Sequence, residues 1–167
     1  MSHSHRWVWF FIVLIVLGAV ALTVPFIYNL RAQLTPEQLA DARALWAKNG
    51  PADYDLIYQE RIDSGPVETF RIEVRGGKVL DVFRREGSEE TKLAKEELSP
   101  AQRQAYGVPE LFGRIERYLD EDRAASRRNY VTAAFDSKDG HPVRYVRRVV
   151  GTQKRLECVV QLLPPHE

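Results

Sequence analysis

The densest group of side chains able to do chemistry lies between Asp136 and His141. Two carboxylates, Asp136 and Asp139, stand beside an imidazole, His141. Such groups can act as acid and base in a hydrolase, or as oxygen and nitrogen ligands of a metal. A calcium loop needs roughly six or more oxygen ligands, however, and Lys138 sits in the middle of this run. Aspartates followed by Gly140 are typical of a turn in which the carboxylates accept bonds from their own backbone. We therefore predict a structural turn with no catalytic residue, no metal and no cofactor.

A hydrolase that uses Asp136, Asp139 and His141 is the alternative, and the supply of histidine argues against it. The chain has four histidines, of which His3 and His5 precede a long apolar segment and His166 is the penultimate residue. A catalytic triad of nucleophile, histidine and acid would then depend on His141 alone. Its place between a glycine and a proline favours packing in the turn. The sequence therefore indicates a protein that is not an enzyme.

Cysteine use is equally sparse. Cys158 is the single cysteine of the chain, so no intramolecular disulfide can form. It alternates in phase with Leu156, Val160 and Leu162, as a residue on the buried face of a strand does. A thiol in that position is typical of a small core side chain.

Basic side chains gather on the hairpin predicted over residues 143–163. The members singled out are Arg144, Arg148, Lys154 and Arg155, called here the basic hairpin. Arg144 and Arg148 are four apart on a strand and share a face, and the turn at Gly151-Thr152 brings Lys154 and Arg155 alongside. This patch could contact an acidic protein or anionic lipid headgroups. The alternative is an ordinary solvated strand face with paired charges.

Length and overall charge limit the classes of function. A chain of 167 residues has room for one domain beside its apolar segment. It carries 24 basic and 23 acidic groups, and Arg6 is the only charged side chain before Arg31. The remainder is therefore neutral. A neutral domain has no general attraction for nucleic acid, so we predict no nucleic-acid partner.

The periodicity of apolar residues predicts two helices and six strands. Thr35-Pro36-Glu37-Gln38 has the form of a capped helix start, and a second helix begins near Val108-Pro109. Trp46 and Phe112 are expected to point from these helices into a sheet. The strands are predicted at 54–62, 67–75, 78–85, 130–136, 143–150 and 155–163. Short links require antiparallel pairing. The soluble domain is thus predicted to be α+β, in the order helix, three strands, helix, three strands, with two helices packed on one face of an antiparallel sheet.

An apolar segment without charge, Trp7–Tyr28, precedes this domain. As a helix it would span roughly 33 Å, enough for a hydrocarbon core of about 30 Å. We predict a single-pass signal anchor in the cell membrane, with the domain outside the cytoplasm. The divisions are a cytoplasmic tail 1–6, a transmembrane helix 7–28, a linker 29–34, the domain 35–163 and a tail 164–167. A signal peptide cleaved after Ala19-Val20-Ala21 is the alternative.

Several landmarks occur together in this chain. They are Trp46 followed by Tyr54, the hairpin Ile72-Glu73-Val74-Arg75-Gly76-Gly77-Lys78-Val79, Leu111-Phe112-x-x-Ile115, and Phe135-Asp136-x-x-x-Gly140-His141-Pro142. In this pattern the chain resembles a family of uncharacterised bacterial exported and lipoprotein-like proteins, a domain of unknown function. The resemblance covers most of residues 40–163. It implies the fold and a location outside the cytoplasm, and it implies no activity.

These observations favour a membrane-anchored, extracytoplasmic, non-catalytic interaction module. Its expected contacts are the membrane, through Trp7–Tyr28, and a protein or anionic-lipid partner at the basic hairpin. A protease-inhibitor-like module that presents the Gly76-Gly77 hairpin as a wedge is a further alternative.

Overall fold

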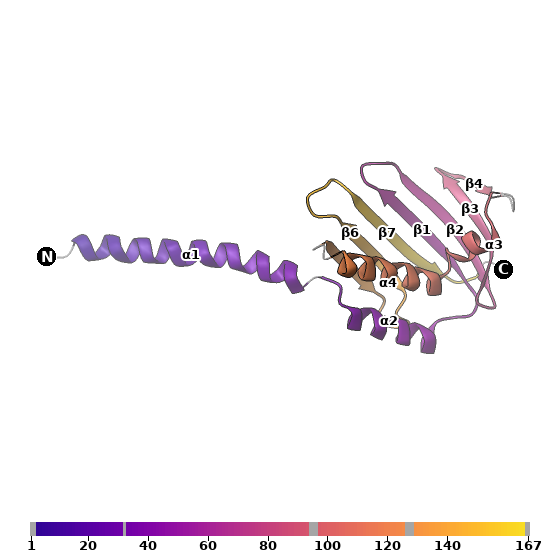
Figure 1. The fold of residues 1–167 in the computed structure, drawn as a ribbon, viewed down its shortest axis with the longest axis horizontal. Coiled ribbons are helices and arrows are strands. Elements are labelled where there is room, and N and C mark those ends of the chain that lie inside the picture. Colours follow the sequence, from indigo (N-terminus) through magenta and orange to yellow (C-terminus); the bar gives the residue numbers. More distant parts are fainter. Residues whose placement is uncertain (1–2, 32, 94–96, 126–128, 166–167) are drawn as a thin grey trace. The chain divides into compact units, whose positions relative to one another are not determined.

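The computed structural model describes residues 3–31, 33–93, 97–125 and 129–165. Two compact units divide the chain, Met1–Gln33 and Leu34–Glu167. The first unit holds helix α1 (His3–Arg31), and the second holds all the strands and the remaining helices (Figure 1).

Helix α1 contains the segment for which a transmembrane helix is predicted, Trp7–Tyr28. Among the described residues, however, no helix combines the length and the apolar character that crossing a membrane requires. The transmembrane part of the predicted fold class is therefore wrong.

The described part of the second unit holds three helices: α2 (Pro36–Asn49), α3 (Pro100–Gln104) and α4 (Val108–Ala124). Thr35 caps α2 as predicted, because its side chain accepts from the N–H of Gln38 while the Gln38 side chain accepts from the N–H of Thr35. Ser99 caps α3 in the same way. Each helix has proline in its first turn, where a missing N–H costs nothing.

Seven strands form one antiparallel sheet in the order β4-β3-β2-β1-β7-β6-β5. They are β1 (Tyr54–Ile62), β2 (Val67–Arg75), β3 (Lys78–Glu86), β4 (Glu89–Lys92), β5 (Tyr130–Phe135), β6 (Pro142–Arg148) and β7 (Arg155–Leu163). Two meanders, β1–β4 and β5–β7, meet where β1 pairs with β7. The α+β class and the antiparallel pairing agree with the prediction, whereas the short strand β4 lies in a segment where no strand was predicted.

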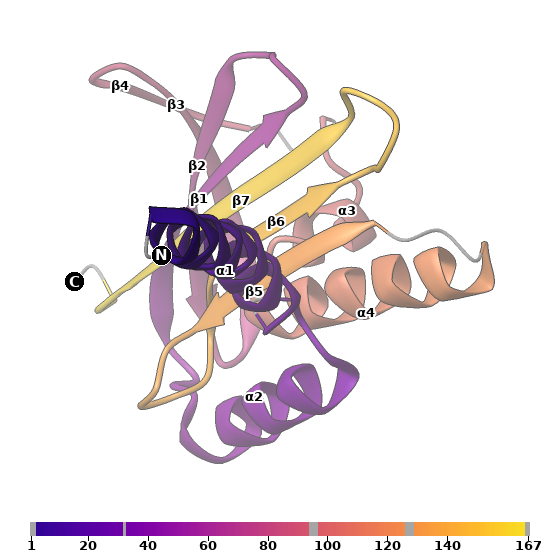
Figure 2. The same cartoon turned by 90° about the vertical axis from the view of Figure 1, so that its left-hand side faces the viewer.

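Alternation along the strands gives the sheet two different faces. On β1, Tyr54, Leu56 and Tyr58 are buried in a core that also contains Trp46 of α2 and Phe112 of α4. Figure 2 shows α2 and α4 on the same side of the sheet. The opposite face, called here the outer face, carries the residues that alternate with these core positions. Trp46 and Phe112 therefore point into the core as predicted.

Candidate functional site

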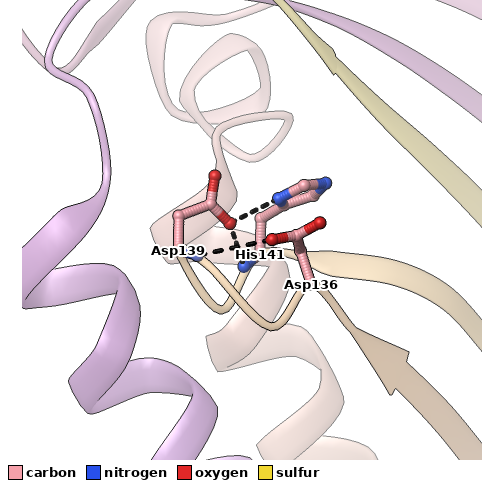
Figure 3. A group of neighbouring side chains, drawn as sticks. All are labelled: Asp136, Asp139 and His141. Carbon is pink, nitrogen blue, oxygen red and sulfur yellow. Dashed lines mark hydrogen bonds and ion pairs between the residues drawn. The ribbon is translucent and has the colours of Figure 1, made fainter.

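The turn between β5 and β6 brings together the three residues predicted as the hydrolase alternative. Asp136, Asp139 and His141 each offer a ligand atom, and these atoms all lie within 4.8 Å of one another (Figure 3). The proximity follows from the local turn, in which the N–H of Gly140 donates to the carbonyl oxygen of Asp136. Gly140 has a φ of 82°, a left-handed conformation that glycine adopts without strain.

The carboxylates of this turn already accept hydrogen bonds from the turn itself. Asp136 Oδ1 accepts from the backbone N–H of Lys138 at 2.7 Å, and this bond holds the pKa of the Asp136 carboxyl below its ordinary value. Asp139 Oδ1 accepts from the backbone N–H of His141 at 2.9 Å and lies 2.6 Å from His141 Nδ1. One oxygen of each carboxylate therefore stabilises the loop.

Helix α2 packs directly against this turn. The side-chain amide of Asn49 donates to the carbonyl oxygen of Lys138 at 2.8 Å, and the rings of Trp46 and His141 lie 6.4 Å apart, edge to face. His141 is only 7% exposed. These contacts support the predicted role of the turn as a structural element that holds β5 and β6 onto α2. The absence of catalysis and of a metal at the turn stays a prediction.

Cys158 is buried in the core, as its phase on the strand predicts. Its sulfur lies 3.2 Å from the hydroxyl of Tyr58, and the guanidinium of Arg114 donates to that hydroxyl from α4. Burial raises the pKa of the Cys158 thiol. The thiolate is the reactive form of cysteine, so this environment suppresses nucleophilic chemistry.

The arginines of the basic hairpin, unlike His141 and Cys158, lie on the outer face of the sheet. Arg144 is registered with Val159 and Arg148 with Arg155, and the two share a face as predicted, while Arg147 lies on the opposite face. Arg147 donates to Asp122 at the end of α4, and Asp122 also accepts from Asn129 at 2.5 Å. On the helix side of β6, Arg147 is therefore bonded within the domain. On the outer side, Arg144 and Arg148 are exposed.

One carboxylate, Glu157 of β7, gathers three arginines on the outer face. Arg144 donates to Glu157 Oε1 at 2.6 Å, and Arg61 and Arg155 each donate to Oε2 at 2.7 Å. Arg144 and Arg61 hold the pKa of Glu157 at about 2, below its ordinary 4.5. We call Arg61, Arg144, Arg155 and Glu157 the arginine cluster.

The cluster includes two residues that were not predicted as part of the basic patch. Arg61 comes from β1, and 96 positions separate it from Glu157. The alternation along the strand places Arg61 on the same face as Gln59, and the sequence shows this alternation. The sequence does not show that β1 pairs with β7. Arg148 and Lys154, which were predicted, have no side-chain ion pair or hydrogen bond within the described residues.

Acid should reveal how far the arginine cluster stabilises the fold. The lowered pKa of Glu157 contributes stability above pH 4.5, and this contribution is lost as the pH falls through about 2. We expect the free energy of unfolding of Glu157→Gln to fall less than that of the wild type between these two pH values. Urea denaturation at several pH values measures this, with Glu121→Gln as the control. Parallel curves for Glu157→Gln and wild type would contradict the predicted coupling.

The predicted wedge of an inhibitor, the Gly76-Gly77 hairpin, is tied back to the start of β1. The N–H of Gly76 donates to Asp53 Oδ1 at 2.6 Å, and the N–H of Gly77 donates to the carbonyl oxygen of Ala52 at 2.8 Å. Both glycines have positive φ, as a two-residue hairpin turn requires. The hairpin geometry is as predicted, and its use against a protease stays a prediction.

Comparison with known proteins places the chain in a family. A family of unknown function (DUF6174) matches residues 38–146. That range covers more than half of the sequence, so the chain belongs to this family. Neither the curated proteins nor the solved structures contain a match.

Proposed function

We propose that this member of the DUF6174 family is a non-catalytic binding module that holds an acidic protein segment on the outer face of its sheet. The observation that carries the proposal is the arginine cluster. Three arginines from three strands converge on the single carboxylate of Glu157 and leave positive charge in excess. The domain as a whole is neutral, so this excess is local.

The geometry of the cluster favours recognition of carboxylates. Glu157 fixes one end of each guanidinium, which lowers the entropy lost when the other N–H groups bind a ligand. Arginine presents several donors in a planar fork that suits carboxylates. The side chains remain accessible, since Arg144 is 55% and Arg61 41% exposed. Arg148 and Lys154 extend the positive charge beyond the cluster.

A protein segment suits this surface better than a lipid surface does. The negative charge of Glu157 stands at the centre of the cluster and would be repelled by a continuous layer of anionic headgroups. A peptide can place its carboxylates over the arginines and a neutral or donor group over Glu157. Complementarity of this kind gives specificity as well as a faster encounter.

The lack of an enzymatic activity is part of the same proposal. The imidazole of His141 contacts Asp139 inside a packed turn, and burial raises the pKa of the Cys158 thiol. Cys158 follows Glu157 directly on β7, but its side chain lies in the core, on the opposite face of the sheet from the arginine cluster. A location outside the cytoplasm, implied by the resemblance to bacterial exported proteins, is also proposed. A C-terminal alkaline phosphatase fusion would be inactive if that location is wrong.

Charge reversal tests the proposed surface. Arg148→Glu combined with Lys154→Glu should weaken binding of a fluorescent oligoglutamate peptide by roughly tenfold, because each exposed charge pair contributes up to about 1 kcal/mol. Added salt should weaken wild-type binding for the same reason. Fluorescence anisotropy of the full chain measures both effects. These two residues are chosen because Arg144→Glu would also place two carboxylates together at Glu157.

The control changes the net charge equally at another place. Lys48→Glu combined with Lys78→Glu reverses two exposed lysines, at the end of α2 and in the β2–β3 hairpin. It should leave peptide binding within about twofold of wild type. Equal loss in both double variants would show only a response to net charge and would overturn the proposal. Binding to phosphatidylglycerol vesicles without binding to the peptide would assign the surface to lipid instead.

A further inference from the structure

A second surface feature lies on the helix side of the sheet, away from the arginine cluster. It is a cavity of about 510 Å³ beside β2, β3 and β4. A volume of this size is typical of sites for small ligands. Phe70 and Arg84, which line it, are registered partners on β2 and β3. We call this cavity the aromatic pocket.

The floor of the aromatic pocket consists of ring faces and edges. Phe70 is 3% exposed and its ring lies 5.3 Å from that of Tyr106. Tyr58 stands behind both, 5.8 Å from Tyr106 and 6.4 Å from Phe70. An aromatic ring face carries partial negative charge and attracts cations.

Carboxylates surround this floor. Glu68, Glu86 and Glu97 line the aromatic pocket, and within the described residues none of the three has an ion-pair partner. Glu68 also lies directly opposite Glu60 in the pairing of β1 with β2. Glu60 already has a cation beside it, since a guanidinium nitrogen of Arg114 lies 3.9 Å from its carboxylate, whereas Glu68 has no such partner among the described residues.

Arg84 already places a cation against the aromatic floor of the pocket. The guanidinium carbon of Arg84 lies 5.9 Å from the centroid of the Phe70 ring. A single arginine does not balance the carboxylates that line the pocket, and the ring of Tyr106 remains beside it. Among the described residues that line it, the pocket therefore has an excess of negative charge, and it offers an aromatic surface and space.

We propose that the aromatic pocket binds a small organic cation with an alkyl body, an alkylguanidinium or alkylammonium group. The ring of Tyr106 contacts the cation, and Glu68 and Glu97 accept its N–H groups. Such a group occurs both as a free amine or guanidine and as an arginine or lysine side chain of a peptide. The pocket lies on the opposite face from the arginine cluster, so the two proposals are independent.

The test uses butylguanidinium and its neutral analogue butylurea, with the blocked tripeptide Ala-Arg-Ala as the peptide arm. NMR titration of the full chain should show shifts in the amides of β2 and β3 with the cations and none with butylurea. Glu68→Gln combined with Glu97→Gln should weaken binding by about threefold or more, as expected for the loss of two partly screened charge pairs. Arg84→Gln should strengthen it by a similar factor, because it removes a competing cation.

The matched control is Glu89→Gln combined with Glu121→Gln, which removes the same charge outside the pocket and should leave affinity unchanged. Tighter binding of the tripeptide than of butylguanidinium would identify a peptide side chain as the ligand, and the reverse would identify a free guanidine. Equal binding of butylurea and butylguanidinium would overturn the proposal. Weaker binding after Arg84→Gln would overturn it as well. Circular dichroism of each variant separates loss of binding from loss of folding.

Discussion

Phe112→Ala is expected to lower the free energy of unfolding by about 3–5 kcal/mol, the usual cost of emptying a large aromatic site in a core. Phe112 is 0% exposed and stacks on Phe135 of β5 at 6.1 Å between ring centroids. It thus joins α4 to the β5–β7 meander. Since a domain of this size is stable by about 5–15 kcal/mol, the loss would be a large fraction of the total. Chemical denaturation followed by circular dichroism measures it.

The control for this substitution is a phenylalanine on the outer face. Phe83 of β3 is partly exposed and lies beneath the guanidinium of Arg71, 4.2 Å from its carbon to the ring centroid. Phe83→Ala removes the same atoms without opening a cavity, so its cost should be below about 2 kcal/mol. If the two substitutions cost the same, the assignment of Phe112 to the core face of the sheet and of Phe83 to the outer face would be wrong.

Short-range patterns in the sequence were sufficient to predict most of the second unit. The capped start at Thr35 and the alternation around Ile72 and Val82 are local signals, and both elements form as predicted. The positions of Trp46 and Phe112 followed from helical periodicity, since a residue on the apolar stripe must face the sheet. The Asp136–His141 turn was also predictable, because the hydrogen bonds that its own residues make with one another join near neighbours.

Other features depend on pairings that no local pattern encodes. Strand β4 has the sequence Glu89-Glu90-Thr91-Lys92, which lacks an apolar residue and forms by pairing with β3. The contact of Arg61 with Glu157 needs the register of β1 against β7. The aromatic pocket likewise combines Phe70 with Tyr106, which come from a strand and from the segment before α4. Such sites become visible only when the strand order is known.

Gly140→Ala is the second substitution with a large expected effect. We expect it to lower the free energy of unfolding by about 2–5 kcal/mol, because the strain of a left-handed alanine adds to the cost of overpacking. A Cβ at this position would lie 2.3 Å from the carbonyl oxygen of Ala42 and 3.0 Å from the Cβ of Leu45. Both atoms belong to α2, and the first is backbone that cannot rotate away. The substitution should therefore push the Asp136–His141 turn off the helix.

A second glycine separates the steric part of this effect from the conformational part. Gly151 has a φ of 80°, against 82° for Gly140, but nothing lies within 4 Å of its Cβ position. Gly151→Ala should therefore cost only the conformational strain, about 1–2 kcal/mol. The difference between the two variants in thermal denaturation measures how tightly the turn packs on α2. Because Trp46 contacts His141 across this junction, its fluorescence should change in Gly140→Ala and stay constant in Gly151→Ala. Equal destabilisation with unchanged fluorescence would mean that the turn is not held by α2, and His141 would then be free to act as the hydrolase alternative requires.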